Sequence, residues 1–234
     1  MKRLLIFDLD DTLLNTSDVY YRTREEFINY MSDSFSLDPK AVRQVFEDLD
    51  REHISLLGYP SWRYTFTMLK TYWSYIEQRK AVFSPISIEK IVNIGNKITL
   101  EIPPLLEGAK DVLVELSRSF TLALLTRGDF RLQKKKIKHY GLDAIFSTVM
   151  VVSAKTEASF LSILLTTGVL PEHAWSIGDS PKWDIFPALN VGMNAILFRY
   201  VHPFYEWKHE KRSMIVDNVP VIEDLRDLRN VLPV

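Results

Sequence analysis

The chain has 234 residues, a formal net charge of −1, and 47% apolar and 25% charged residues. This composition is typical of a globular protein that is long enough for a sizeable core and a second, smaller module. The balanced charge excludes the basic surface of a dedicated nucleic-acid binder. The absence of cysteine excludes disulfides, thiolate nucleophiles and zinc–thiolate sites.

The first apolar run spans residues 3–7 (Arg-Leu-Leu-Ile-Phe) and stops at Asp8. We interpret it as a buried strand that places Asp8 at its carboxyl end. A signal peptide would need a longer apolar segment, and the acids at positions 8 and 10 interrupt this one. No stretch approaches the length of a membrane span. We therefore expect a cytoplasmic protein with no membrane partner.

Residues 16–100 have a different pattern, with many aromatic residues and only two glycines. Apolar residues recur there at helical spacing, for example at Phe27, Tyr30 and Met31. Asp38 followed by Pro39 predicts a helix N-cap with proline at the first helical position. This segment is predicted to be an all-helical cap domain of about four helices.

After Pro103-Pro104, apolar runs alternate with segments of helical pattern. Strands are expected at residues 120–125, 149–152, 174–177 and 195–198, and helices at 109–116, 129–140 and 157–165. Strands that alternate with helices of this length indicate βαβ units and a parallel sheet. The predicted fold is thus a Rossmann-like, doubly wound α/β domain made of residues 1–15 and 101–234, with residues 16–100 inserted as the helical domain.

Two acids, Asp8 and Asp10, follow the first predicted strand. Side chains alternate along a strand, so both carboxylates would lie on the same side if the strand continued that far. Two converging carboxylates repel each other and need a cation or a shared proton. A hard divalent ion such as Mg²⁺ suits such oxygen ligands.

Further polar residues follow the next strands along the chain. Thr126 ends the second strand before a glycine and a helix start, a place suited to binding an anion. Lys155 follows the third strand, and Asp179 and Asp184 follow the fourth. In an open parallel sheet these carboxyl ends meet at one edge. The assembly there is suited to metal-assisted transfer of a phosphoryl group.

A basic run occupies residues 131–139, Arg-Leu-Gln-Lys-Lys-Lys-Ile-Lys-His. Its lysines wrap around the predicted helix, and the charge of the whole chain is balanced. We therefore interpret the run as a solvated helix face and not as a nucleic-acid site.

The ordered motifs resemble those of the haloacid dehalogenase-like hydrolases. They are Asp-Leu-Asp-Asp-Thr from Asp8, Thr-Arg-Gly from Thr126, the lone Lys155, and Gly-Asp-Ser-x-x-x-Asp ending at Asp184. The resemblance covers the whole α/β part, and the helical insert is similar to the family's C1-type cap. Arg127 and Trp183 stand where the family often has asparagine, and Thr156 follows the lysine where proline is common.

The resemblance implies a role for each motif residue. Asp8 would be the nucleophile that forms an aspartyl-phosphate, and Asp10 the general acid and base. Thr126 and Lys155 would bind the phosphoryl group, with Arg127 as a further candidate. The cofactor would be Mg²⁺, held by Asp8, the backbone carbonyl of Asp10, Asp179 and Asp184.

The resemblance further implies an Mg²⁺-dependent phosphomonoester hydrolase acting on a small phosphorylated metabolite. Asp10 disfavours a dehalogenase, because halide leaves without a proton. A phosphotransferase or phosphomutase of the same family and a non-catalytic binding protein of this fold remain alternatives. Arg63, Trp62 and Arg22 are candidate substrate contacts in the cap, chosen by chemical type alone. The chain is expected to act as a monomer or a homodimer.

Overall fold

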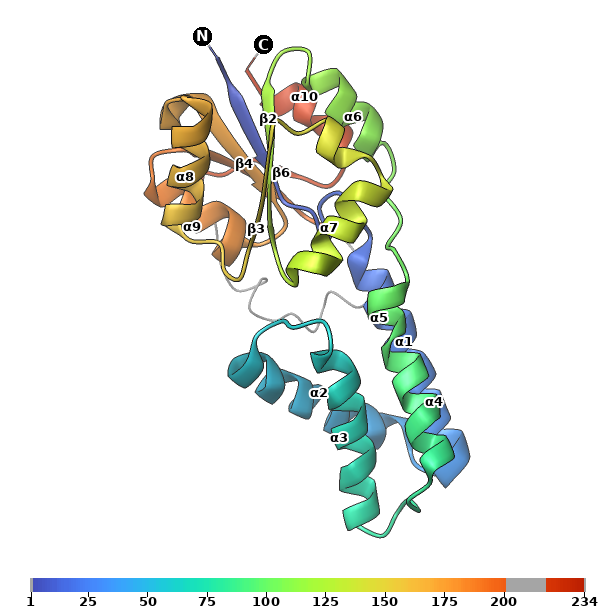
Figure 1. Ribbon diagram of the computed structural model, residues 1–234. Coiled ribbons are helices and arrows are strands. Elements are labelled where there is room, and N and C mark those ends of the chain that lie inside the picture. Colours follow the sequence, from blue (N-terminus) through green and yellow to red (C-terminus); the bar gives the residue numbers. More distant parts are fainter. Residues whose placement is uncertain (1, 201–217, 234) are drawn as a thin grey trace. The chain divides into compact units, whose positions relative to one another are not determined.

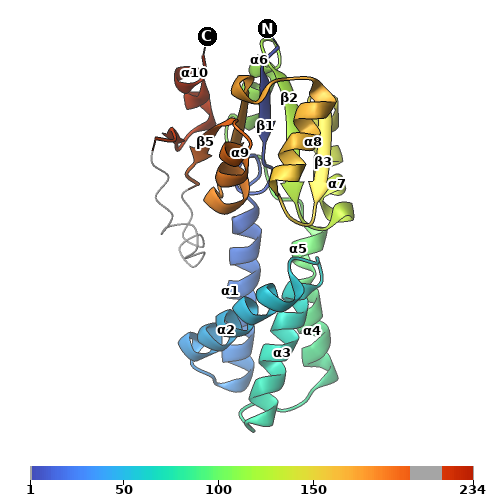
Figure 2. The same ribbon diagram turned by 90° about the vertical axis from the view of Figure 1, so that its left-hand side faces the viewer.

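The computed structural model describes residues 2–200 and 218–233 (Figures 1 and 2). The chain divides into two compact units, one made of Met1–Ser17 and Pro103–Val234, the other of Asp18–Ile102. Within the described ranges, no helix is both long enough and apolar enough to cross a membrane.

The first unit is built on a six-stranded parallel sheet of order β3-β2-β1-β4-β5-β6. The strands are β1 (Leu4–Phe7), β2 (Thr121–Arg127), β3 (Thr148–Val152), β4 (Ala174–Gly178), β5 (Asn194–Phe198) and β6 (Val221–Ile222). The predicted parallel α/β sheet is confirmed, and β6 is an addition that the sequence did not reveal. It has two residues, too few to show the apolar run of a buried strand.

Both faces of this sheet are covered, which explains why β1 is apolar throughout. Leu4 and Ile6 belong to a buried cluster with residues of α8 (Glu157–Thr167) and α9 (Phe186–Asn190). Leu5 and Phe7 belong to a second cluster on the other face, where the helices are α6 (Ala109–Leu116), α7 (Phe130–His139) and α10 (Leu228–Val231). Figure 1 shows α8 and α9 on one side of the sheet and α6, α7 and α10 on the other.

Short turns of helix connect these elements. Among the residues that the structure describes, three are 3₁₀-helices, at Leu142–Ala144, Pro171–His173 and Leu225–Asp227. A fourth, Pro181–Ile185, has the wider π-helical hydrogen bonding and follows β4 directly. Such π-helical turns are often found at functional sites.

The second unit is helical, as its pattern predicts. Its helices are α1 (Thr16–Phe35, which begins in the first unit), α2 (Pro39–Leu57), α3 (Arg63–Glu77), α4 (Pro85–Gly95) and α5 (Lys97–Leu100). The Asp38 carboxylate accepts hydrogen bonds from the backbone N–H groups of Lys40 and Ala41, so the predicted N-cap is confirmed. Gly95 lets α4 approach α3 closely, because a Cβ there would lie 2.5 Å from Thr65 Oγ1.

Candidate active site

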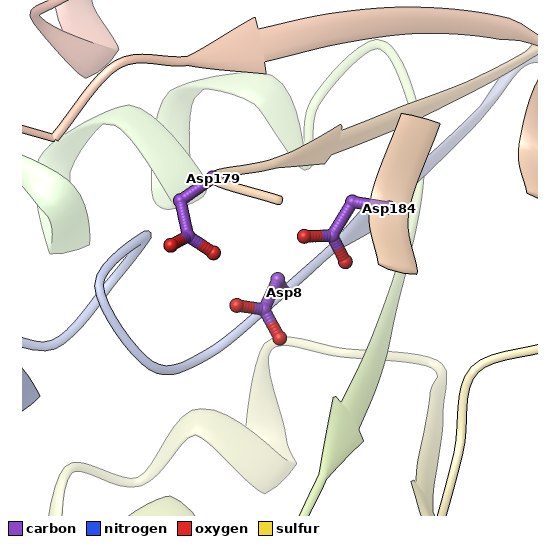
Figure 3. A group of neighbouring side chains, drawn as sticks. All are labelled: Asp8, Asp179 and Asp184. Atoms are coloured by element: carbon purple, nitrogen blue, oxygen red, sulfur yellow. The ribbon is translucent and has the colours of Figure 1, made fainter. Parts of the chain in front are cut away.

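Three carboxylates converge at the carboxyl ends of β1 and β4 (Figure 3). Each of Asp8, Asp179 and Asp184 offers an oxygen, and these oxygens all lie within 4.8 Å of one another. All three residues are buried, with exposed fractions of 8%, 6% and 2%. Burying three like charges together is costly unless a cation accompanies them.

The sheet register brings the first two acids together. Phe7 of β1 lies opposite Ile177 of β4, and the N–H of Asp8 donates to the carbonyl of Ile177 at 2.9 Å. Asp8 therefore leaves its strand beside Gly178, directly before Asp179.

Asp184 reaches the same place from the π-helical turn after β4. Its carboxylate accepts the backbone N–H of Ser180 at 2.9 Å, which fixes the side chain against the turn. Gly178 leaves the necessary space, because a Cβ there would lie 2.3 Å from the Asp184 Cγ. The glycine before Asp179 is therefore required by the close approach of Asp184.

Lys155 follows β3 and joins two of the acids. Its ammonium group forms ion pairs with both Asp8 and Asp184, and its side chain is 3% exposed. Burial alone would lower the pKa of Lys155, but the charges of Asp184 and Asp8 raise it above its ordinary value. Lys155 therefore carries its charge at neutral pH.

One lysine does not balance three acids. Burial, with the neighbouring charges of Asp184 and Asp179, raises the pKa of Asp8 to about 7, although Lys155 opposes the shift. The site therefore has an excess of negative charge that a bound cation would offset.

The residues present fit a hard divalent cation. The donors of the three-acid cluster are carboxylate oxygens, which such cations prefer. Within the described part of the chain, the buried Ser180 Oγ beside this cluster has no hydrogen-bond partner. A hydrated metal ion would supply such a partner.

The rest of the first motif forms a tight turn. Thr12 is fully buried, and its hydroxyl donates to Asp8 Oδ2 over a long 3.4 Å. Asp11 adopts a left-handed backbone conformation with φ of 61°. Its carboxylate accepts from the Ser17 backbone N–H at 2.7 Å and the Ser17 hydroxyl at 2.6 Å, which ties the turn to the start of α1.

Asp10 points to a different set of partners. Its carboxylate accepts hydrogen bonds from Thr16 Oγ1 at 2.5 Å, Gln133 Nε2 at 2.7 Å and Lys136 Nζ at 2.7 Å. Burial alone would raise the pKa of Asp10, but the charge of Lys136 and these hydrogen bonds lower it below its ordinary value. In the protein without substrate, Asp10 is therefore held as a carboxylate.

The interpretation of residues 131–139 as a solvated face is wrong for Lys136, which is 4% exposed. Gln133, in the same run, is 2% exposed. Both lie on the face of α7 that also buries Ile137, because residues three or four apart share one side of a helix. That spacing was the signal by which the sequence could have revealed them.

Thr126 and Arg127 lie at the end of β2. Thr126 is fully buried, and its Oγ1 accepts from Gln133 Nε2 at 2.6 Å. The Arg127 guanidinium lies over the ring of Trp183, 4.3 Å from its centroid. Two of the three positions that depart from the family pattern, Arg127 and Trp183, are thus in contact.

The three candidate substrate contacts lie in the helical unit. Arg63 is 4% exposed and forms an ion pair with buried Asp50. Its charge is therefore already neutralised by a partner inside the helical unit. The prediction that Arg63 contacts substrate gains no support from this position. Arg22 pairs on the surface with Asp18 at 2.8 Å and Glu101 at 3.3 Å.

The third candidate, Trp62, is 54% exposed and meets the ring of Phe66 edge to face, with the centroids 5.9 Å apart. Its substrate contact stays a prediction.

Comparison with known proteins agrees with this architecture. The family profile described as haloacid dehalogenase-like hydrolase matches residues 5–198, and the chain belongs to that family. The expectation of a hydrolase of this family is thereby confirmed.

The individual relatives and solved structures given next share about a quarter of their residues with this chain. Human N-acylneuraminate-9-phosphatase is 26% identical over 204 residues, which cover 84% of this chain and 82% of the relative. Glyceraldehyde 3-phosphate phosphatase of Methanothermobacter thermautotrophicus is 25% identical over 238 residues, covering 99% and 100%. Among solved structures, a haloacid dehalogenase-like family hydrolase from Xanthomonas campestris has a TM-score of 0.76 at 24% identity, covering 97% of this chain and 88% of that one.

Proposed function

We propose that this protein is an Mg²⁺-dependent phosphatase that hydrolyses a small phosphomonoester through an aspartyl-phosphate on Asp8. The observation that carries the proposal is the convergence of Asp8, Asp179 and Asp184 around one point, with Lys155 joining Asp8 to Asp184. The curated relatives described above are named as phosphatases, which supports the same activity.

The metal would be held by the carboxylates of Asp8, Asp179 and Asp184, with the backbone carbonyl of Asp10 as a further ligand. When bound, Mg²⁺ supplies positive charge against the phosphoryl oxygens and offsets the repulsion between the three acids. Lys155 adds a fixed positive charge beside Asp8.

The first chemical step is an in-line displacement at phosphorus. An oxygen of Asp8 forms a bond to phosphorus, and the bond from phosphorus to the ester oxygen breaks. In the substrate complex, the negative charge of the phosphate ester favours the protonated form of Asp10, which gives its proton to the departing alkoxide. Thr126, Lys155 and the additional candidate Arg127 bind the phosphoryl oxygens.

The second step returns the enzyme to its starting state. Asp10, now a carboxylate, takes a proton from a water molecule as the water oxygen attacks phosphorus. The bond between phosphorus and Asp8 breaks, and inorganic phosphate leaves. Splitting hydrolysis into two displacements in this way is covalent catalysis. The predicted cytoplasmic location and the monomeric or homodimeric state stand as parts of this proposal.

The test is phosphate release from p-nitrophenyl phosphate, measured with Mg²⁺ and with EDTA. We expect Mg²⁺-dependent turnover that falls by at least roughly 1,000-fold in Asp8→Asn, because the amide is no nucleophile. The matched control is Asp111→Asn, an exposed acid of α6, which should keep wild-type turnover. Intact-mass measurement of quenched enzyme should show one added phosphoryl group in the wild type and none in Asp8→Asn. Turnover that survives Asp8→Asn would refute the aspartyl-phosphate.

A further inference from the structure

Two residues of α7 donate hydrogen bonds to the carboxylate of Asp10. Lys136 Nζ lies 2.7 Å from Asp10 Oδ1, and Gln133 Nε2 lies 2.7 Å from Asp10 Oδ2. Gln133 and Lys136 are three positions apart, so a single face of the helix presents both donors. Each carboxylate oxygen of Asp10 therefore has its own donor from α7.

The placement of Lys136 is costly without Asp10. A buried ammonium loses its hydration, and its burial is tolerated only when a partner of opposite charge is close. Lys136 is 4% exposed, whereas the side chain of Asp10 is 27% exposed. Lys136 is thus buried in the protein, whereas the Asp10 carboxylate is partly open to solvent and accessible to a ligand.

Gln133 connects Asp10 to the residue proposed to bind phosphate. A carboxylate only accepts hydrogen bonds, so the amide group that faces Asp10 is the NH₂. The same nitrogen lies 2.6 Å from Thr126 Oγ1. Thr126 accepts this bond, so its own O–H is left to donate in another direction. The two amide hydrogens of Gln133 are shared with a third acceptor, the carbonyl oxygen of Arg127 at 3.3 Å, so Gln133 links Asp10, Thr126 and the end of β2 in one hydrogen-bond network.

We propose that Gln133 and Lys136 are positioning residues that hold Asp10 for proton transfer and align it with Thr126. The inference rests on the proposed function and assigns to it two residues outside the family motifs quoted above. The competing explanation is that the Lys136–Asp10 pair only stabilises the fold. A stabilising pair would not distinguish between leaving groups, whereas a device that positions a proton donor would.

The experiment compares p-nitrophenyl phosphate with phenyl phosphate. The two esters differ only by a para-nitro group, but phenolate is a much stronger base than p-nitrophenolate and needs more help from a proton donor. The quantity measured is kcat/KM, which reports the steps up to departure of the leaving group. In the wild type, general acid catalysis should keep the two values close to each other.

The variants are Lys136→Met, Gln133→Met and the conservative Lys136→Arg, with Lys138→Met as the matched control. Lys138 lies on the same helix and is exposed. We expect Lys136→Met to lower kcat/KM for phenyl phosphate by about 10–100-fold, a part of the contribution of a general acid. For p-nitrophenyl phosphate the fall should be several-fold smaller. Lys136→Arg should restore part of the loss, and Lys138→Met should change neither substrate.

Thermal unfolding of each variant shows whether it folds. If Lys136→Met does not fold, Gln133→Met still tests the inference, because it exchanges one uncharged side chain for another. Equal losses for both esters in the folded Lys136 and Gln133 variants would overturn the inference and leave the proposed function standing. An inactive wild type would overturn the proposed function, and the inference with it.

Discussion

The guanidinium of Arg127 lies over the indole ring of Trp183, with its central carbon 4.3 Å from the ring centroid. Arg127 ends β2, and Trp183 belongs to the turn after β4. These two strands flank β1, so the contact links segments on either side of the strand that leads to Asp8. Trp183 directly precedes Asp184, and a change in the stack should therefore affect the proposed metal site.

Trp183→Ala should weaken the binding of Mg²⁺. Loss of the stack costs about 0.5–2 kcal/mol and loosens the turn that presents Asp184. We expect the Mg²⁺ concentration for half-maximal turnover to rise by roughly 3–10-fold. Phe120→Ala is the matched control, because it removes a similar pair, Arg3 over Phe120 at 4.6 Å, near the start of β2. An unchanged Mg²⁺ requirement in Trp183→Ala would show that the stack does not support Asp184.

Gly178→Ala should displace Asp184. The new Cβ would lie 2.3 Å from the Asp184 Cγ, closer than any real contact, so the carboxylate must move. We expect turnover at saturating Mg²⁺ to fall by roughly 100-fold or more, since small displacements of catalytic groups are that costly. Gly95→Ala creates a comparable clash with Thr65 in the helical unit. It should lower the unfolding temperature without changing the Mg²⁺ requirement. Near-normal turnover in Gly178→Ala would contradict the assigned role of this glycine.

The contribution of Asp8 to the stability of the metal-free protein should fall between pH 4 and pH 8. The pKa of Asp8 is raised from 3.8 to about 7 in the folded chain, so the folded state holds a proton that the unfolded state has released in this range. This contribution is complete below the unfolded pKa and is lost as the pH rises through about 7. Lys155 adds no slope there, because its raised pKa acts only in the alkaline range.

Asp8→Asn removes this contribution and its dependence on pH. We therefore compare the unfolding temperature of Asp8→Asn with that of the wild type in EDTA. The difference in favour of the variant should be larger at pH 8 than at pH 5. Thermal unfolding followed by circular dichroism measures both values. In the wild type, Mg²⁺ binding below pH 7 should release protons, which calorimetry in buffers of different ionisation enthalpy detects. A difference between variant and wild type that does not vary with pH would refute the raised pKa of Asp8.

Arg63→Met should destabilise the helical unit strongly. It leaves Asp50, 1% exposed, as a buried charge without its ion-pair partner, which costs about 3–5 kcal/mol. The double variant Asp50→Leu with Arg63→Met removes both charges and should recover most of that loss. Urea unfolding measures the three free energies. If Arg63 has only a structural role, the double variant keeps the wild-type KM. A large rise in KM in a stable double variant would support the predicted substrate contact.

Much of the sheet could be predicted from short stretches of sequence. Residues 3–7 are apolar because both faces of β1 are buried, and the run ends at Asp8 because the strand reaches the polar edge there. β6 was not predicted, because its two residues are held by pairing with β5 and not by a pattern of their own. The π-helical turn that carries Asp184 likewise has no pattern that separates it from an ordinary helix start.

The sequence by itself determined the acids and the strand ends that present them, because solvation and strand alternation act over a few neighbouring residues. Only the tertiary structure decided that Lys136, within a basic run, pairs with Asp10, 126 positions earlier in the chain. It likewise decided that Arg127 meets Trp183 and that Arg63 pairs with Asp50. These three contacts depend on which segments the order of strands and helices brings together. The local sequence does not reveal them, because a lysine or arginine has the same local preferences whether its charge lies in solvent or against a buried acid.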